Sequence, residues 1–392
     1  MTAASERKTI QLSAPFLHGN EWNYVKECID TGWVSSAGKY VEKFEADFSA
    51  FVGASHAVAC VNGTAALHVA LRIVGVCPGD EVIVPTLTFI ATVDAVKYLG
   101  AEPIFMDCDE FYNIDSDKTS DFLHRETESR NGSTYNKRTG RRIAAIVPVH
   151  VFGNAVRMHE ITEVCRERNI RIVEDATESL GTFYTNTELR NRHTGTVGDI
   201  GCFSFNGNKI ITTGGGGMIV TNVAEYAAKA KYLTTQAKDD EARYVHHEVG
   251  YNFRLTNILA AIGVAQLEQL PEFLTAKRKN YLTYKAGIDT INGLSLVESP
   301  PYARNNHWMY ALQVDGKVYG RDWEELMEYL KEQGIQTRPV WYLNHLQLPY
   351  RDCQSYRIEK AIQMLKITLC IPCSSDLQER DIEYVIDRLR NG

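Results

Sequence analysis

Lys209 is the residue in this sequence best placed for covalent chemistry. It follows the apolar run at residues 201–205 and precedes four consecutive glycines at residues 214–217. A lysine amine forms a Schiff base with a carbonyl only when it is neutral, and burial among apolar neighbours favours the neutral form. Glycines also let the backbone pass close to a bulky ligand without a Cβ clash. The alternative interpretation is a flexible hairpin that carries an exposed lysine.

Asp175 is a second candidate, because an apolar segment ends directly before it. Residues 170–174 read Ile-Arg-Ile-Val-Glu, a pattern typical of a buried strand. Ligands of open α/β sheets bind at the carboxyl ends of the strands, which is where this strand would present the carboxylate. A carboxylate there can keep a pyridine nitrogen protonated, so that the ring withdraws electrons from a substrate carbanion. The alternative role for Asp175 is the N-cap of a helix.

The sequence Asn62-Gly63-Thr64 indicates an anion site. It lies between an expected strand at residues 56–61 and an apolar helical segment. The start of a helix exposes unpaired N–H groups and a partial positive charge, Gly63 permits a close approach, and the Thr64 hydroxyl can donate to a phosphate. An ordinary capped turn is the alternative, because polar residues commonly precede helices.

The order of these three segments points to one site. A phosphate turn near residue 63, an acid near residue 175 and a lysine near residue 209 are the fixed points that a pyridoxal phosphate site requires. Each segment alone has an ordinary structural explanation, whereas the three together support one another. The sequence therefore predicts pyridoxal 5'-phosphate as the cofactor.

Short apolar runs alternate with helix-like segments over much of the chain. This alternation predicts an α/β fold with a mainly parallel sheet covered by helices. The polar stretch at residues 126–139 is expected to be a surface loop or an insertion within the large domain. The expected strands are residues 56–61, 81–85, 102–107, 143–149, 171–174, 200–205 and 217–221.

A change of domain is expected near Pro271. The helical pattern at residues 258–267 leads to this proline, and a charged helix containing residues 277–279 follows it. We therefore expect a large domain at residues 1–271 and a smaller, C-terminal α/β domain at residues 272–392, which contains few residues of catalytic type. The division suits a chain of 392 residues.

Composition narrows the class of partner. A formal charge of −7 and a pI near 5.9 disfavour nucleic acid and membrane surfaces and favour small molecules as ligands. The polar start at residues 1–8 lacks the apolar core of a signal peptide, so we expect a cytoplasmic protein.

Nine cysteines are scattered along the chain, a pattern that favours free thiols over disulfides. The pair Cys370 and Cys373 lacks the second CxxC of a zinc ribbon, and no metal is expected.

At these residues the chain resembles the DegT/DnrJ/StrS family of nucleotide-sugar aminotransferases, which share the fold type I of aspartate aminotransferase. The resemblance covers most of the chain. Singly its motifs are weak, and together they are specific. They are residues 32–48, Asn62-Gly-Thr-Ala-Ala-Leu67, Pro85-Thr-Leu-Thr-Phe-Ile-Ala-Thr92, Glu174-Asp-Ala176, residues 204–209 and Gly250-Tyr-Asn-Phe-Arg254.

The resemblance implies a role for each matched residue. Lys209 would carry the cofactor as a Schiff base and later move protons, and Asp175 would pair with the pyridinium nitrogen. Asn252 would reach into the site of a partner subunit, which implies a homodimer. Arg338 and His345 are candidates for contacts with the sugar, although buried structural roles are equally open. The remaining cofactor contacts would be Gly63, Thr64 and Ser204 on the phosphate, Phe89 stacked on the ring, and Glu178 near the ring hydroxyl or the incoming amine.

Two departures from the family pattern are Asn62, where serine is commoner, and Glu178, where a neutral residue is usual. Together with residues 206–213 they resemble the branch that aminates C4 of UDP-linked 4-keto-6-deoxy-N-acetylhexosamines, with L-glutamate as donor. Aminotransferases of dTDP- or GDP-linked keto sugars and a non-catalytic sugar-binding regulator remain alternatives. Sugar dehydratases of the family carry histidine at the lysine position, so Lys209 argues against that activity.

Overall fold

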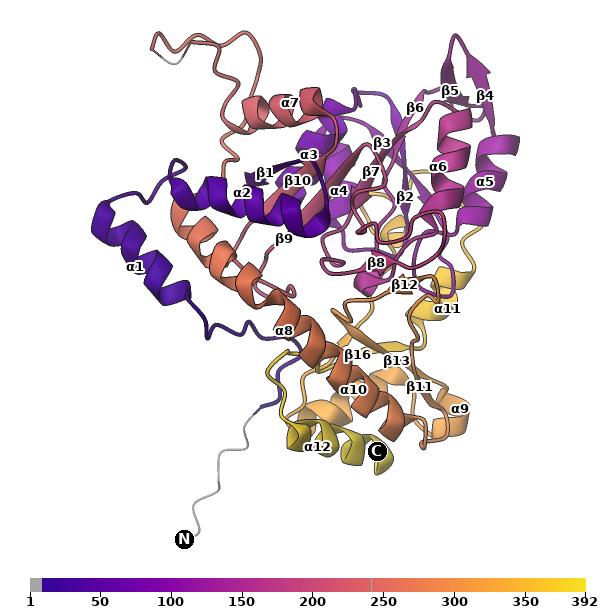
Figure 1. Ribbon diagram of the computed structural model, residues 1–392. Helices are drawn as coiled ribbons and strands as arrows, with labels where there is room; N and C mark the ends of the chain where they lie inside the picture. The colour runs from indigo at the N-terminus through magenta and orange to yellow at the C-terminus, as the bar shows by residue number, and fades with distance from the viewer. Residues whose placement is uncertain (1–8, 241) are drawn as a thin grey trace.

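The computed structural model describes residues 9–240 and 242–392, and the polar start at residues 1–8 lies outside this part of the chain. A large mixed sheet is flanked by helices, and a smaller sheet lies towards the carboxyl terminus (Figure 1). Within the described residues, no helix has both the length and the apolar character needed to cross a bilayer.

Eight strands form the large sheet in the order β1-β10-β9-β7-β6-β2-β3-β15. Neighbours from β9 to β15 are parallel, whereas β10 is antiparallel to both β1 and β9. The predicted α/β class and all seven predicted strands are confirmed, with small shifts of their ends. The strands are β1 His56–Cys60, β2 Glu81–Pro85, β3 Glu102–Met106, β6 Ile143–Ile146, β7 Arg171–Asp175, β9 Ile200–Ser204, β10 Gly217–Thr221 and β15 Ser355–Tyr356.

Helices cover both faces of this sheet. One face packs against α3 (Gly63–Ile73), α4 (Ala91–Tyr98) and α7 (Ala224–Thr234). The other face packs against α2 (Lys39–Val52), α5 (Ser116–Arg125), α6 (Met158–Glu167) and the first half of α8 (Asn257–Ile288). Helix α1 (Glu21–Thr31) lies beside α8 (Figure 1).

Successive residues of the strands enter different cores, as the strand geometry requires. In β2, Val82 and Val84 belong to the core beneath α3 and α4, whereas Ile83 belongs to the core beneath α5 and α6. In β9, Cys202 and Phe203 divide in the same way between opposite faces. Burial on both faces explains why these strands appear in the sequence as short continuous apolar runs.

The smaller sheet has its own apolar core. Its antiparallel strands follow the order β11-β13-β16-β14 and pack against the second half of α8, α10 and α12. Because α8 is one continuous helix with Pro271 inside it, the domain boundary predicted after residue 271 falls within a helix. The elements are β11 Leu294–Leu296, β13 Tyr310–Val314, β14 Arg338–Pro339, β16 Thr368–Ile371, α9 Gly316–Tyr319, α10 Trp323–Glu332 and α12 Glu379–Arg390.

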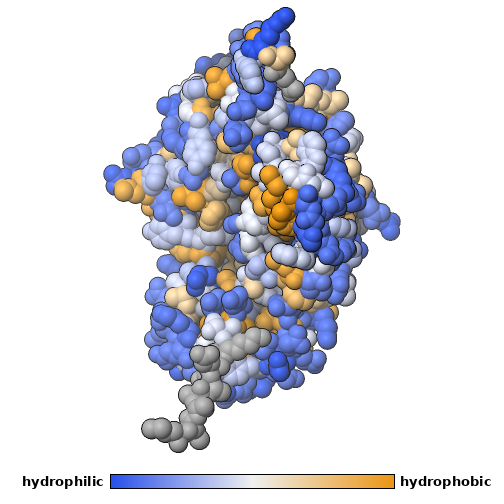
Figure 2. All heavy atoms as spheres, turned by 90° about the vertical axis from the view of Figure 1, so that its left-hand side faces the viewer, coloured by the Kyte–Doolittle hydropathy of each residue, from blue (hydrophilic) through white to orange (hydrophobic). Residues whose placement is uncertain are grey.

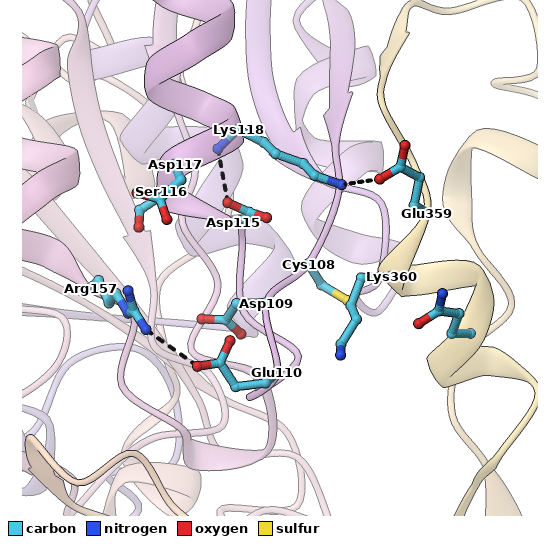
Figure 3. Close-up of a pocket in the computed structure, with 11 residues that line it drawn as sticks. Cys108, Asp109, Glu110, Asp115, Ser116, Asp117, Lys118, Arg157, Glu359 and Lys360 are labelled. Atoms are coloured by element: carbon cyan, nitrogen blue, oxygen red, sulfur yellow. Dashed lines mark hydrogen bonds and ion pairs between the residues drawn. The ribbon is translucent and has the colours of Figure 1, made fainter.

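Part of the C-terminal region returns to the large sheet. Strand β15 pairs with β3, and the buried carboxylate of Asp107 accepts hydrogen bonds from the backbone N–H groups of Glu359 (2.9 Å) and Lys360 (2.8 Å), where α11 (Lys360–Leu365) begins. Lys118 donates to Asp107 (2.7 Å) and reaches Glu359 (3.0 Å), as Figure 3 shows for the second contact. These contacts anchor the C-terminal region on β3.

Residues 126–139 do not form the surface loop that was one of the two expectations for this stretch. The structure has an antiparallel hairpin there, made of β4 (Thr127–Arg130) and β5 (Ser133–Asn136). Asn131 and Gly132 join the strands with φ values of 49° and 76°. An Asn-Gly pair with two positive φ angles is the preferred two-residue hairpin turn, so the polar segment pairs with itself. The remaining short elements are β8 Phe183–Tyr184, β12 Ala303–Arg304, η1 Val151–Gly153 and η2 Asn344–Leu346.

Candidate active site

A cavity of about 500 Å³ opens at the edge where the carboxyl ends of β1, β7 and β9 meet. The sheet topology explains this location, because parallel strands present the residues that follow them at a common edge. The cavity brings together predicted residues that are up to 146 positions apart in the chain. Those lining it are Gly63, Thr64, Phe89, Asp175, Glu178, Ser204 and Lys209.

The start of α3 forms one end of the lining. The side chain of Asn62 caps the helix by accepting a hydrogen bond from the Ala65 N–H (2.7 Å). Gly63 is buried, and a Cβ on it would lie 2.9 Å from Cβ of Ser204 and 3.1 Å from Cγ2 of Thr177. Only glycine therefore fits between the helix start and the end of β9, which leaves N–H groups and hydroxyls facing the cavity.

Asp175 is the last residue of β7 and is only 3% exposed. One of its oxygens, Oδ2, accepts a hydrogen bond from Oγ1 of Thr92 (2.6 Å). The other, Oδ1, accepts from the backbone N–H of Thr177 (3.1 Å). These two donors fix the carboxylate in a buried position from which it can bind a cationic group in the cavity.

Lys209 follows β9 in a short turn, and its side chain is 13% exposed. Its Nζ lies 3.6 Å from Oε1 of Glu178 and 4.1 Å from the centroid of the Trp308 ring. The lysine is thus held on the cavity wall between a carboxylate and an aromatic face. The alternative of an exposed lysine is wrong: Lys209 does lie in the connection between the antiparallel strands β9 and β10, but its side chain is largely buried on the cavity wall.

Glu178 is buried beside the lysine. Its Oε2 accepts a hydrogen bond from the Phe152 N–H (2.8 Å). Burial raises the pKa of Glu178 to about 7, against the opposing effects of Lys209 and the Phe152 N–H, and the charge of Asp175 raises it further. A carboxyl group with this pKa can hold or release a proton near neutral pH.

The other predicted residues lie in different surroundings. Phe89 borders the cavity with 54% of its surface exposed, so it is accessible to a ligand there. Asn252 and Arg338 are exposed, and Arg338 donates to the carbonyl of Thr337 (3.0 Å). His345 pairs through Nδ1 with Oγ1 of Thr86 (2.6 Å). Asn252, Arg338 and His345 do not line the cavity of their own chain, and their predicted roles stay predictions.

Three further residues of the site have no role in the sequence-based prediction. Thr92 binds Asp175, Trp308 contacts Lys209, and Trp341 lines the cavity while stacking on Phe152 at 5.1 Å. Thr92 belongs to a motif quoted for the family resemblance, which was the one available signal. Trp341 lies in the segment at residues 337–345, whose resemblance to the family suggested Arg338 and His345 instead, and no signal in the sequence indicated that Trp308 lies near Lys209.

A separate cavity of about 340 Å³ lies between the end of β3 and α11 (Figure 3). Its charged side chains pair largely with one another, as in the ion pair of Arg157 with Glu110 (3.3 Å). Burial raises the pKa of Asp109 to about 7. None of the predicted site residues lines this cavity, so the site of interest is the one that contains Lys209.

Comparisons with known proteins agree with this geometry. The DegT/DnrJ/EryC1/StrS aminotransferase family matches residues 16–390. The chain is 39% identical to GDP-perosamine synthase of Caulobacter vibrioides over 98% of both chains, and 36% identical to that of Escherichia coli O157:H7 over 97% of this chain and 98% of the other. The crystal structure of DesI with its TDP-sugar product superposes with a TM-score of 0.87 at 26% identity, covering 99% of this chain and 94% of that one.

The match extends over nearly the whole length of this chain. The names of these relatives refer to nucleotide-linked sugars. Pyridoxal phosphate is the cofactor of this class of enzyme, as the lysine and acid in the cavity lead one to expect. The chain therefore belongs to the DegT/DnrJ/EryC1/StrS aminotransferase family, as a pyridoxal phosphate-dependent nucleotide-sugar aminotransferase.

Proposed function

We propose that the enzyme transfers the amino group of L-glutamate to C4 of a GDP-linked 4-keto-6-deoxy sugar. The observation that carries this proposal is the cavity in which Lys209, Asp175 and the start of α3 converge. The names of the two relatives at 39% and 36% identity support GDP as the nucleotide.

The cavity fits the phosphate end of the cofactor. A Cβ at residue 63 would occupy the space between the start of α3 and Ser204. Because Gly63 leaves this space open, the first N–H groups of α3 and the hydroxyls of Thr64 and Ser204 are available as donors to a phosphate. These N–H and hydroxyl donors carry no formal charge. The partial positive charge at the start of α3 adds to their attraction for the phosphate dianion.

The cavity also fits the ring. Asp175 is buried with both oxygens fixed, so it can hold the pyridine nitrogen in its protonated state. The exposed side chain of Phe89, on the lining of the cavity, can stack on the ring. When bound, pyridoxal phosphate supplies an aldehyde that condenses with amines and a cationic ring that accepts electrons from the adjacent carbon.

Lys209 and Glu178 are proposed to move protons around this ring. Nζ of Lys209 removes the proton from the α-carbon of the amino donor and, in the second half of the cycle, delivers a proton to C4 of the sugar. Proton transfer by a positioned amine accelerates such steps by roughly 10²–10⁴-fold. Glu178, with its pKa of about 7, exchanges a proton with the amine that enters or leaves.

A homodimer in which Asn252 completes the partner's cavity is part of the proposal. Asn252 is exposed and lies outside the cavity of its own chain. Large apolar side chains on and after α1 are also exposed, among them Trp22 (74%), Ile29 (59%) and Trp33 (59%). Figure 2 faces the side of the molecule that carries α1, and hydrophobic groups gather near the middle of that face. A second copy would remove such groups from water.

A UDP-linked 4-keto-6-deoxy-N-acetylhexosamine is the second candidate substrate. It is favoured by the resemblance of Asn62, Glu178 and residues 206–213 to the branch that uses such sugars. Asn62 and Glu178 both lie on the lining of the cavity in which we propose that the cofactor binds, so they bear on the cofactor more directly than on the nucleotide. We therefore rank this candidate below the GDP-linked sugar.

The test supplies the enzyme with pyridoxal phosphate, L-glutamate and, separately, GDP-, UDP- and dTDP-linked 4-keto-6-deoxy sugars. Mass spectrometry follows the exchange of the ketone for an amine, and kcat/KM is compared. We expect the GDP-linked sugar to be preferred by at least about tenfold, and Lys209→Ala to form no product. Preference for the UDP-linked sugar would favour the second candidate, and amination by Lys209→Ala would refute the assignment of the lysine.

A further inference from the structure

Asn306 is a buried residue that connects the two side chains in contact with Lys209. It lies shortly before β13, is 1% exposed and does not itself line the cavity. Its Nδ2 donates to the carbonyls of Glu178 (2.8 Å) and Leu180 (3.0 Å), and its Oδ1 accepts from the backbone N–H of Trp308 (2.9 Å). Only this orientation of the amide places both of its N–H groups on carbonyls and its oxygen on a donor.

Glu178 is held by Asn306 from two directions. Nδ2 of Asn306 binds the main chain of Glu178 directly. The backbone N–H of Asn306 also donates to Oγ1 of Thr182 (3.0 Å), which in turn donates to the carbonyl of Gly153 (2.9 Å). The residue before Gly153 is Phe152, whose N–H donates to Oε2 of Glu178 (2.8 Å). The main chain and the carboxylate of Glu178 are therefore both fixed by contacts that lead to Asn306.

The turn that binds the carboxylate of Glu178 packs tightly against Asn306. A Cβ on Gly153 would lie only 2.9 Å from Cγ of Asn306. Phe152 has a φ of 56°, which is uncommon for a residue other than glycine and persists only where the surroundings enforce it. The N–H of Phe152 thus points at Glu178 because the neighbouring segments, Asn306 among them, hold this turn in place.

The turn that carries Lys209 is held by the same amide. Because Oδ1 of Asn306 accepts from the N–H two residues later, it forms an Asx turn that fixes Trp308. Nε1 of Trp308 donates to the carbonyl of Asn208 (2.7 Å), the residue directly before Lys209. Nζ of Lys209 lies 4.1 Å from the centroid of the indole. Asn306 therefore reaches Lys209 through one tryptophan.

We propose that Asn306 is a positioning residue that sets the distance between the carboxylate of Glu178 and the amine of Lys209. This inference rests on the roles in proton transfer that we propose for these two residues. A proton passes directly between two groups only when their heavy atoms come within about 3 Å. Nζ and Oε1 are 3.6 Å apart, so a small movement of either segment decides whether they reach this distance.

Crystal structures of the cofactor-free full chain measure this geometry. Asn306→Ala removes all three hydrogen bonds of the amide, and Thr182→Val removes the hydroxyl that links Asn306 to Gly153. We expect the distance between Nζ of Lys209 and Oε1 of Glu178 to exceed the roughly 4 Å of an ion pair in Asn306→Ala, and to lengthen in Thr182→Val as well. An unchanged distance in either folded variant would overturn the proposal.

Asn136→Ala is the matched control for the loss of a buried asparagine. Asn136 is fully buried and its amide also makes three hydrogen bonds, but it belongs to the hairpin of β4 and β5 and does not line the cavity. This variant should keep the distance of the parent. A change as large as that in Asn306→Ala would mean that any loss of core packing disturbs the pair.

The second measurement is the half-reaction with saturating L-glutamate in the absence of sugar, followed by the absorbance of the cofactor. Asn306→Ala should slow it about 10- to 100-fold, as displacement of reacting groups does. Glu178→Gln lacks the acid, so Asn306→Ala should slow that variant by a factor at least about threefold smaller. Asn136→Ala should react as the parent does. The same factor with and without Glu178 would show that Asn306 does not act through this acid, contrary to the proposal.

A failure of the proposed function gives a different result. If Glu178→Gln alone reacts as fast as the parent, its proposed part in proton transfer is refuted, whereas the crystallographic distances still decide whether Asn306 places the two residues. Unfolding midpoints identify any variant that fails to fold. If Asn306→Ala is among them, Thr182→Val decides, because it must lengthen the same distance and slow the same half-reaction.

Discussion

Oε1 of Glu178 lies 3.6 Å from Nζ of Lys209, and the two side chains are 3% and 13% exposed. The residue that carries the proposed chemistry is thus paired with an acid whose pKa is raised to about 7, chiefly by burial. At neutral pH a small change in the surroundings of this pair moves a proton on or off the carboxyl group. A neutral glutamine or histidine at position 178 would lack this property or have it at another pH.

Replacement of Glu178 by glutamine should change how stability depends on pH. The pKa of Glu178 is raised from its ordinary value of 4.5 to about 7 in the folded protein, so the folded state holds this proton more tightly than the unfolded state. The stability gained from this proton is fully present below about pH 4.5 and is lost as the pH rises through 7. The cofactor-free Glu178→Gln variant should gain up to about 3 kcal/mol relative to the parent between pH 5 and pH 8. Denaturant midpoints across this range measure the effect, with exposed Glu163→Gln as the control. Parallel pH curves would contradict the expectation.

Replacement of Gly63 by alanine should weaken binding of pyridoxal phosphate. The new Cβ would meet Cβ of Ser204 at 2.9 Å, so the start of α3 and the end of β9 must separate and their donors no longer converge. Overpacking of this kind costs about 1–3 kcal/mol, or roughly 5- to 150-fold in affinity. Absorbance titration with the cofactor measures it. Gly207→Ala, where no atom lies within 4 Å of the added Cβ, is the matched control and should bind as the parent does.

Loss of the Thr92 hydroxyl should impair catalysis through Asp175. Thr92→Val removes the 2.6 Å hydrogen bond to Oδ2 and leaves the Thr177 N–H as the donor to this carboxylate. A hydrogen bond to a charged group contributes about 1.5–3 kcal/mol, so kcat should fall about 10- to 100-fold. Thr92→Ser keeps the hydroxyl and should retain most of the activity. Equal activity of the valine and serine variants would show that the hydrogen bond has no part in the reaction.

Mixed dimers should reveal whether Asn252 serves the partner's site. Lys209→Ala and Asn252→Ala each impair both sites of a uniform dimer. A dimer of one subunit of each kind has one site with Lys209 intact and Asn252 supplied by the other subunit. After random re-association, activity should approach about a quarter of the parent value. If Asn252 acts within its own chain, every site of the mixed dimer lacks either Lys209 or Asn252. Mixing the two variants then restores no activity.

The strands that build the site were predictable from local sequence. Residues 82–85 and 217–220 are continuous apolar runs, and they lie in the fully buried strands β2 and β10. The hairpin of β4 and β5 was missed because its strands are polar, so that only the Asn131-Gly132 turn indicated it. Turn chemistry there outweighed composition, since a hairpin on the surface needs no apolar face to satisfy its backbone.

The C-terminal part of the site could not be predicted in this way. Trp308 and Trp341 reach the cavity because α8 carries the chain to the smaller sheet, while β15 and the contacts of Asp107 bring a later segment back to β3. Arg338 and His345 lie in the same region, and neither lines the cavity. Although Arg338 and His345 are close to Trp341 in the sequence, only Trp341 of these three residues lines the cavity.

The sequence by itself determined the chemistry of this protein: a lysine after an apolar run, an acid at the end of a buried strand and a glycine at the start of a helix. Each depends on residues adjacent in the chain, and parallel strands bring their carboxyl ends to one edge whatever the details of packing. Only the tertiary structure decided which groups surround Lys209. The indole of Trp308 and the carboxylate of Glu178 meet its amine through contacts between distant segments, and such contacts are set by the packing of the whole core.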